Sequence, residues 1–164
     1  GQLLLINTTE QDRKDNIFAL VNQLNFGTDL LTTQPEKDEL AQLNLIAGQK
    51  AKAATAYEAA VNYLNVGLEL LSQDSWESRY DLTFNFYLEA AEAEYLNTNL
   101  ERAGILCDRA LQQAKTILEQ VNLYVLKIRL DLAKNQIQSA LDTGLQVLEM
   151  LEVTISQSPP EELN

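Results

Sequence analysis

Few side chains in this sequence have the types and the spacing that catalysis requires. Glu89, Glu92 and Glu94 crowd one stretch, and neighbouring carboxylates can act as general acid and general base when their surroundings separate their pKa values. A chain with 24 acidic and 12 basic residues offers a plainer account, because its charge clusters are mostly solvated faces. We therefore expect these glutamates to form a solvated acidic face.

The segment Gly48 to Lys52, Gly-Gln-Lys-Ala-Lys, is the next candidate, because glycine and lysine together can cradle a phosphate. It lacks the second glycine and the Gly-Lys-Ser/Thr ending of a phosphate-binding loop. Lys50 and Lys52 precede an expected helix start, where anions are favoured. A weak anion site and solvated lysines at the end of a repeat are the two alternatives, and we favour the lysines.

The sequence has no histidine and a single cysteine, Cys107. Zinc and most transition-metal sites lose their usual ligands, and nucleophile–histidine pairs are excluded. Cys107 lies on an apolar stripe, so we expect a packed thiol. One cysteine cannot form an intramolecular disulfide, which favours a reducing, cytoplasmic setting. We expect no cofactor, no metal and no catalytic residue, and a segment that is not an enzyme.

The formal net charge of −12 restricts the partners. The basic residues are scattered along the chain, whereas nucleic-acid binding needs clustered Lys or Arg. The same charge disfavours an anionic membrane surface, and no apolar run approaches the roughly 20 residues that span a bilayer. We expect neither nucleic acid nor membrane as a partner.

The elements that must position these residues are helices. Hydrophobic residues make up 46% of the chain, with only six Gly and three Pro, which favours an all-α fold. Thr98 and Glu101 resemble a capping box at a helix start, and an apolar stripe of helical period follows. The pattern recurs from Thr55 and from Asn135. The spacings of 43 and 37 residues are typical of stacked helix pairs.

Periodicity and capping signals predict about seven antiparallel helices in one domain. The first continues through Gly27 to Leu31, and the others are expected over 33–50, 56–71, 74–95, 98–121, 123–133 and 136–152. Residues 12–153 form the repeat domain, 1–11 a remnant of a preceding region, and 154–164 a polar tail or linker. The opening at Gly1 instead of Met suggests a piece of something longer.

The fourth predicted helix carries an unusual aromatic load. Its aromatic residues include Trp76, Tyr80, Phe84, Tyr87 and Tyr95. Buried aromatics contribute much core area, so we expect them to fill the space between helices. The alternative is that one edge of the helix forms a partner-binding surface, since exposed aromatic anchors are typical of binding hot spots.

The repeat element is similar to the second half of a tetratricopeptide repeat, through Thr98-Asn99, Ala103 and Ala110-Leu111. It departs from that family in its long spacing and in lacking the loop glycine. More of the chain, from Asp12 to Val153, resembles the helical region of large cyanobacterial multidomain serine/threonine kinases. The resemblance rests on the segments Val21–Asn25, Leu43–Lys52, Thr55–Tyr57 and Gly67–Leu71, and on the following Trp76.

This resemblance implies a non-catalytic, tetratricopeptide-like superhelix beside kinase, STAND-type ATPase, GAF and histidine-kinase modules. Such a scaffold would bind a protein partner or other domains of its own chain. The alternative is a small-molecule-sensing helical arm of a STAND-type regulator. In tetratricopeptide repeats the first helix of each pair lines the groove. Carried over by register, the candidate groove residues are Gln42, Asn85 and Asn122 at one level and Gln49, Glu92 and Arg129 at another.

Overall fold

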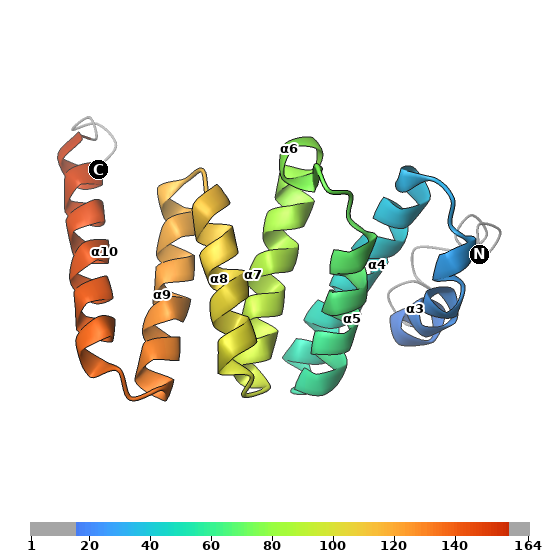
Figure 1. Ribbon diagram of the computed structural model, residues 1–164, viewed down its shortest axis with the longest axis horizontal. Coiled ribbons are helices and arrows are strands. Elements are labelled where there is room, and N and C mark those ends of the chain that lie inside the picture. The colour runs from blue at the N-terminus through green and yellow to red at the C-terminus, as the bar shows by residue number, and fades with distance from the viewer. Residues whose placement is uncertain (1–15, 158–164) are drawn as a thin grey trace.

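The computed structural model describes residues 16–157, and this part of the chain is all-α, with eight α-helices and no strand (Figure 1). The helices are α3 (Ile17–Phe26), α4 (Gln34–Ala53), α5 (Tyr57–Leu70), α6 (Ser75–Ser78), α7 (Tyr80–Leu96), α8 (Leu100–Gln113), α9 (Ile117–Ala133) and α10 (Ile137–Gln157). A short 3₁₀ helix, η1 (Thr28–Leu30), follows α3. The expected N-terminal remnant, 1–11, lies outside the described residues.

The helices are arranged in three pairs that stand in a row (Figure 1). α4 packs on α5, α7 on α8, and α9 on α10, and successive pairs touch through α5–α7 and α8–α9. The first helices of neighbouring pairs also touch, α4 with α7 and α7 with α9. The pair α7–α8 therefore lies between the other two pairs, and α10 stands at one end of the row.

The same tight turn joins the two helices of every pair. Its central residue is Thr55, Thr98 or Asn135, and all three have left-handed backbone, with φ of 61°, 66° and 59°. At the first turn the N–H of Ala56 donates to the Ala51 carbonyl, 2.9 Å away, and equivalent bonds close the other two turns. These bonds define a Schellman motif, in which the left-handed residue ends the preceding helix.

The predicted capping boxes at Thr55, Thr98 and Asn135 are therefore wrong, although the register of the three copies is kept. These residues end the first helix of each pair instead of starting the second. Capping boxes do occur at the starts of first helices, at Thr33, as predicted, and at Thr116. The capping residues Thr33 and Thr116 have extended backbone, as is typical of an N-cap.

Three helix boundaries differ from the predictions. α3 ends at Phe26, and Gly27 turns the chain into η1 instead of continuing the helix, with Phe26 exposed to solvent. The fourth predicted helix breaks at Arg79 into α6 and α7, and Thr83 Oγ1 donates to the Ser75 and Arg79 carbonyls across the break. The fifth ends at Gln113, because the Thr116 box starts α9.

The C-terminal boundary of the last helix also differs. α10 continues through Gln157, so residues 154–157, expected in a polar tail, are helical. The rest of the expected tail, 158–164, lies outside the described residues.

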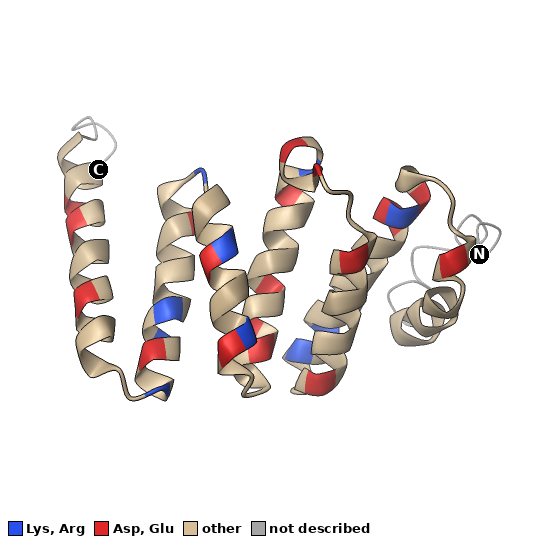
Figure 2. Ribbon diagram, viewed as in Figure 1, with Lys and Arg blue, Asp and Glu red and all other residues tan. Residues whose placement is uncertain are grey.

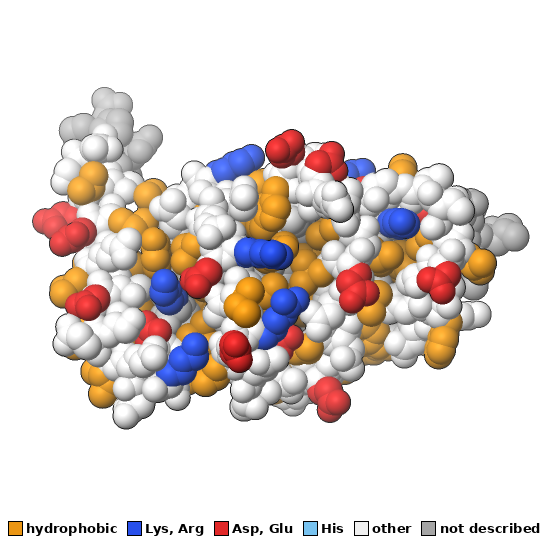
Figure 3. Space-filling model, in the orientation of Figure 1, with side chains coloured by type: hydrophobic (Ala, Val, Ile, Leu, Met, Phe, Trp, Pro, Cys, Tyr) orange, Lys and Arg blue, Asp and Glu red, His pale blue; other side chains and the backbone are white. Residues whose placement is uncertain are grey.

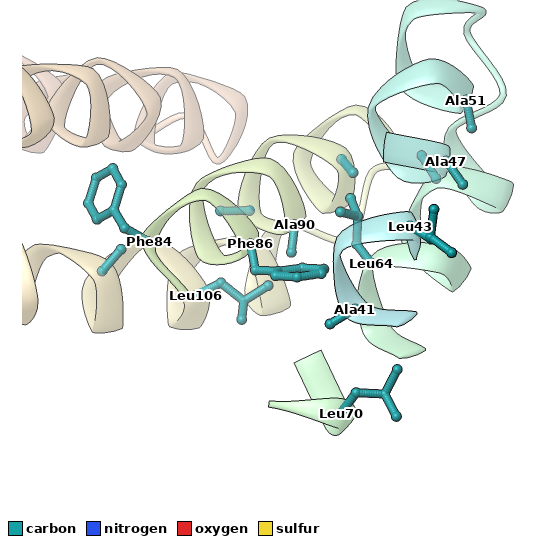
Figure 4. Packing of buried hydrophobic residues seen from close by; sticks show 14 of the residues in the cluster. Ala41, Leu43, Ala47, Ala51, Leu64, Leu70, Phe84, Phe86, Ala90 and Leu106 are labelled. Carbon is teal, nitrogen blue, oxygen red and sulfur yellow. The ribbon is translucent and has the colours of Figure 1, made fainter. Parts of the chain in front are cut away.

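The core runs through the middle of the row, where α4, α5, α7 and α8 meet (Figure 4). Phe86 and Leu64 are fully buried there. Two glycines let these helices approach closely: a Cβ added at Gly67 would lie 2.2 Å from the Phe86 ring, and one at Gly48 would lie 2.6 Å from Leu64. No larger side chain fits at Gly67 without moving α7 away from α5.

Candidate interaction surface

A charged cluster joins the ends of α4 and α7. The ammonium of Lys52 lies 2.6 Å from Glu89 Oε2 and 2.6 Å from Glu92 Oε2. The Gln49 amide donates to Glu89 Oε1 at 3.4 Å. All three charged side chains are partly buried. The expected solvated acidic face is thus wrong for Glu89 and Glu92, which hold a lysine between two helices. It is also wrong for Glu94, which is buried on α7 and only 4% exposed.

The two glutamates of the cluster keep Lys52 in its charged form. Partial burial by itself lowers the pKa of Lys52, and the hydrogen bonds and charges of Glu89 and Glu92 more than offset this, so its pKa lies above the ordinary value. A lysine held charged in this way is not a general base. Lys50 and Lys52 lie in the last turn of α4, where cations are favoured. The weak anion site considered from the sequence therefore loses Lys52.

The six predicted groove residues all lie on the first helices of the pairs. Gln42 and Gln49 are on α4, Asn85 and Glu92 on α7, and Asn122 and Arg129 on α9. Five of the six are exposed, and Glu92 is half-buried. The structure brings Gln49 and Glu92 into the same cluster, through Glu89 and Lys52.

The aromatic side chains of α6 and α7 are mostly packing residues. The Trp76 ring lies tilted against the rings of Tyr80 and Tyr87, with centroid distances of 6.0 and 4.9 Å. Phe84 is buried and stacks on Tyr80 at 5.9 Å. Trp76, Tyr80 and Tyr87 are half-buried against the core. These contacts favour the packing alternative for this helix.

Tyr80 also ties α7 to the start of α9. Its hydroxyl donates to Glu119 Oε2 at 2.7 Å and accepts from the Lys115 N–H at 3.2 Å, and the Lys115 ammonium lies 3.9 Å from the ring centre. Desolvation and the Glu119 carboxylate raise the pKa of Tyr80 to about 12. Desolvation raises the pKa of Glu119, but hydrogen bonds from Tyr80, Lys115 and Thr116 outweigh it and lower that pKa.

Cys107 is a packed thiol, as predicted. It is buried, and its Sγ–H donates to the Leu123 carbonyl of α9 at 3.3 Å. Burial, with a smaller contribution from Asp108, raises the pKa of the thiol to about 12. A thiol of that pKa carries almost no thiolate at neutral pH, so Cys107 is unreactive in the folded protein.

An apolar surface on α10 was not expected from the sequence. Six large apolar side chains of this helix are more than half exposed, and four of them lie along one hollow: Ile137 (57%), Leu141 (57%), Leu145 (60%) and Leu148 (63%). With Ile128 and Leu132 of α9 they line a hollow of about 340 Å³ over Gly144. We call this surface the α9–α10 groove. Figure 3 shows apolar side chains along this end of the molecule.

The charge around the α9–α10 groove is acidic on the α10 side. α10 carries Asp142, Glu149 and Glu152 and contains no Lys or Arg (Figure 2). The apolar spacing of Ile137, Leu141 and Leu148 was visible in the sequence. Periodicity alone, however, does not say whether an apolar stripe is covered.

Comparisons with known proteins supply a context for this segment. No family model matches the chain, and no solved structure matches it. The hybrid signal transduction histidine kinase G of Dictyostelium discoideum is 34% identical over 132 residues, which cover 71% of this chain. The chain spans only 4% of the length of that relative. The similarity supports a signal-transduction kinase context for this helical segment.

Two features that residues 16–157 lack bear on the kind of site. No helix within residues 16–157 has the length and the apolar run that a bilayer span needs. Within the same residues no three His, Cys, Asp or Glu side chains are grouped as metal ligands would be.

Proposed function

We propose that this segment is a non-catalytic, tetratricopeptide-like scaffold of a large signal-transduction kinase. It mediates contacts with a protein partner or with other domains of the same polypeptide. The serine/threonine kinase and STAND-type ATPase setting, first suggested by resemblance, belongs to this proposal.

The arrangement of the helix pairs carries the proposal. First helices α4, α7 and α9 touch one another in sequence order, as they do where helix pairs stack into a superhelix. They present exposed polar side chains at Gln42, Asn85 and Asn122. Stacked pairs create an extended surface from several helices, and such a surface suits a peptide or a domain better than a small molecule.

The test compares two triple variants of the polypeptide as its gene encodes it. The first replaces Gln42, Asn85 and Asn122 with arginine. The control replaces one exposed polar residue on each second helix, Asn62, Gln112 and Gln138, also with arginine. We expect the first variant to weaken capture of partner domains at least tenfold and to change kinase output, with the control within about twofold of wild type.

Two results would count against the scaffold. If both triple variants match wild type in capture and in kinase output, while both melt normally, the first helices do not form the binding surface. If a metabolite raises the melting temperature of the wild-type protein and the first variant abolishes that rise, the small-molecule sensor is favoured instead, through linkage between binding and stability.

A further inference from the structure

Large exposed hydrophobic side chains gather at one end of the row of helices. Among residues 16–157, sixteen large hydrophobic side chains are exposed, and ten of them lie on α9 and α10. Every residue that lines the α9–α10 groove is apolar. A contiguous apolar surface of this kind marks an interaction site more often than it occurs by chance.

The two equivalent surfaces inside the molecule are each covered by a helix. α7 packs against both α4 and α5, and α9 packs against both α7 and α8. Counted from the shared turns, Gly144 of α10 corresponds to Leu64 of α5 and Cys107 of α8, which are 0% and 1% exposed. The shape of this surface is therefore one that a helix fills.

The surface on α10 is more apolar than its two equivalents. By the same count, Leu145 corresponds to Asn65 of α5 and Asp108 of α8. Leu145 is 60% exposed, so a leucine stands where the two covered copies have a polar side chain. A surface that faces only water gains nothing from such a leucine, whereas a surface that binds a helix gains an apolar contact.

The carboxylates beside the groove have no cationic partner among residues 16–157. Glu149 and Glu152 lie four residues after Leu145 and Leu148, so each neighbours a groove leucine on the surface of α10. Asp142 lies two turns before Glu149, on the same side of the helix. The α10 edge of the groove is therefore an acidic border beside an apolar surface (Figure 2).

We propose that the α9–α10 groove binds an amphipathic α-helix of a partner protein. Large apolar side chains of that helix fill the hollow over Gly144, and Lys or Arg along one edge face the carboxylates of α10. The other edge of the groove carries the exposed Arg129 of α9, so the basic side of the bound helix lies over α10. This surface is separate from the polar surface of the first helices that carries the proposed function.

A second copy of the chain is a poorer occupant than a basic helix. Each copy has a net charge of −12 and an α10 without Lys or Arg. Placing two such surfaces against each other sets like charges side by side, which disfavours association.

Two designed peptides of about 18 residues test the helix and its charge. Both carry leucines at the i, i+4 and i+7 positions, and they differ only along one flanking edge, which is lysine in the first and glutamate in the second. Fluorescence anisotropy measures binding to the 164-residue chain, and circular dichroism measures helix formation in the bound peptide. We expect the lysine peptide to become helical and to bind at least tenfold more tightly than the glutamate peptide, with a smaller difference at high salt.

Two substitutions on α10 locate the site. Leu148→Gln removes a groove leucine, and Val153→Gln removes a 55% exposed apolar side chain that does not line the groove. We expect Leu148→Gln to weaken binding of the lysine peptide about tenfold, because it removes a buried apolar contact from the complex. Val153→Gln should leave the affinity within about twofold of wild type.

Charge reversal tests the acidic border. Asp142→Lys combined with Glu149→Lys should reverse the preference, so that the glutamate peptide binds at least as tightly as the lysine peptide. Glu39→Lys combined with Glu69→Lys makes the same change in net charge at exposed positions of α4 and α5. This control should keep the preference for the lysine peptide within about twofold of wild type.

Three outcomes would overturn the proposal. No binding of the lysine peptide up to about 100 µM would mean that the groove does not accept a basic helix. Equal effects of the two charge reversals would mean that the peptide responds to net charge and not to the groove. A dimer in sedimentation that Leu148→Gln dissociates would identify a second copy of the chain as the occupant. These variants leave Gln42, Asn85 and Asn122 unchanged, so failure of the groove and failure of the scaffold are distinguishable.

Discussion

The groove of α7–α8 and the groove of α9–α10 are built on the same register but differ in exposure. α9 closes the first, with Cys107 1% exposed and bonded to Leu123. The second is open within residues 16–157, and Leu148 is 63% exposed. The difference comes from the neighbour and not from the kind of residue, because both grooves are apolar. Within residues 16–157 the exposed leucines of α10 therefore mark an apolar surface that no described helix covers. The following substitutions test this comparison.

The largest contrast is expected from truncating leucines. Leu64→Ala leaves a cavity at a fully buried position and should lower the free energy of unfolding by about 3 kcal/mol. Leu148→Ala removes an exposed side chain and should cost about 0.5 kcal/mol or less in residues 1–164. Urea denaturation followed by circular dichroism measures both. Equal losses would mean that the α9–α10 groove is buried in solution.

Glycine-to-alanine substitutions should have opposite signs in the two regions. A Cβ at Gly67 would lie 2.2 Å from the Phe86 ring, so Gly67→Ala should destabilise the fold by about 2 kcal/mol. At Gly144 the nearest atom, in Ile128, is 4.0 Å from the added Cβ. Gly144→Ala should therefore stabilise α10 by about 0.5–1 kcal/mol through helix propensity. Thermal melts of both variants decide the signs, and a destabilising Gly144→Ala would contradict the open groove.

Substituting two lysines compares the partly buried ion pairs of Lys52 with an exposed ion pair. Lys52→Met leaves Glu89 and Glu92 without their shared cation and should cost about 1–2 kcal/mol, less than a fully buried pair because solvent reaches the cluster. Lys127 lies 3.6 Å from Asp108 on the surface, and Lys127→Met should cost about 0.5 kcal/mol or less. Chemical denaturation at low and high salt compares them. If high salt abolishes the loss of stability caused by Lys52→Met, the cluster is exposed to solvent.

The left-handed turns predict small gains in stability. A β-branched residue with positive φ is strained, so Thr98→Gly should stabilise the protein by about 1 kcal/mol despite the entropy of glycine. Asn tolerates this conformation better, so Asn135→Gly should change stability by only about 0.3 kcal/mol. Melting temperatures of the two variants check the order. A destabilising Thr98→Gly would mean that the turn geometry differs in solution.

The smallest effect concerns Tyr80, at the closed contact between α7 and α9. Its pKa is raised to about 12 from 10.0, so its contribution to stability is present below pH 10 and is lost as the pH rises through about 12. Absorbance at 295 nm follows the phenol, and Tyr80→Phe removes that transition. Glu119→Gln should bring the pKa of Tyr80 down. A Tyr80 that titrates at its ordinary value would mean that the Glu119 contact does not persist.

The sequence was sufficient to predict the helices but not the turns that join them. Apolar periodicity placed most helices within a few residues, and the Thr33 box was found because its pattern includes Pro35 and Glu36. Thr98 misled because threonine and a glutamate three residues later are also compatible with a left-handed turn. That turn is fixed by backbone hydrogen bonds to the Glu94 and Tyr95 carbonyls, which depend on the path of the chain. The glycine that usually marks such a turn is absent here, so the residue types gave no sign of it.

The surface chemistry was less predictable, for a physical reason. Glu89 and Glu92 lie in a row of acidic residues, and the lysine that pairs with them is about 40 residues away in the sequence, on another helix. The six groove residues lie on first helices, and their role in binding stays a prediction. The exposed face of α10 could not be predicted, because exposure depends on which elements pack against the helix.

The order of helix contacts also has a kinetic consequence. Among residues 16–157, the principal helix contacts join elements that are close in sequence, so the chain closes only short loops as it folds. Such low contact order favours fast folding that can start at any pair and spread. Unfolding should then begin at the end, where α10 is held mainly by α9. Native-state hydrogen exchange would show amide protection falling from α7 toward α10 as a gradient along the chain.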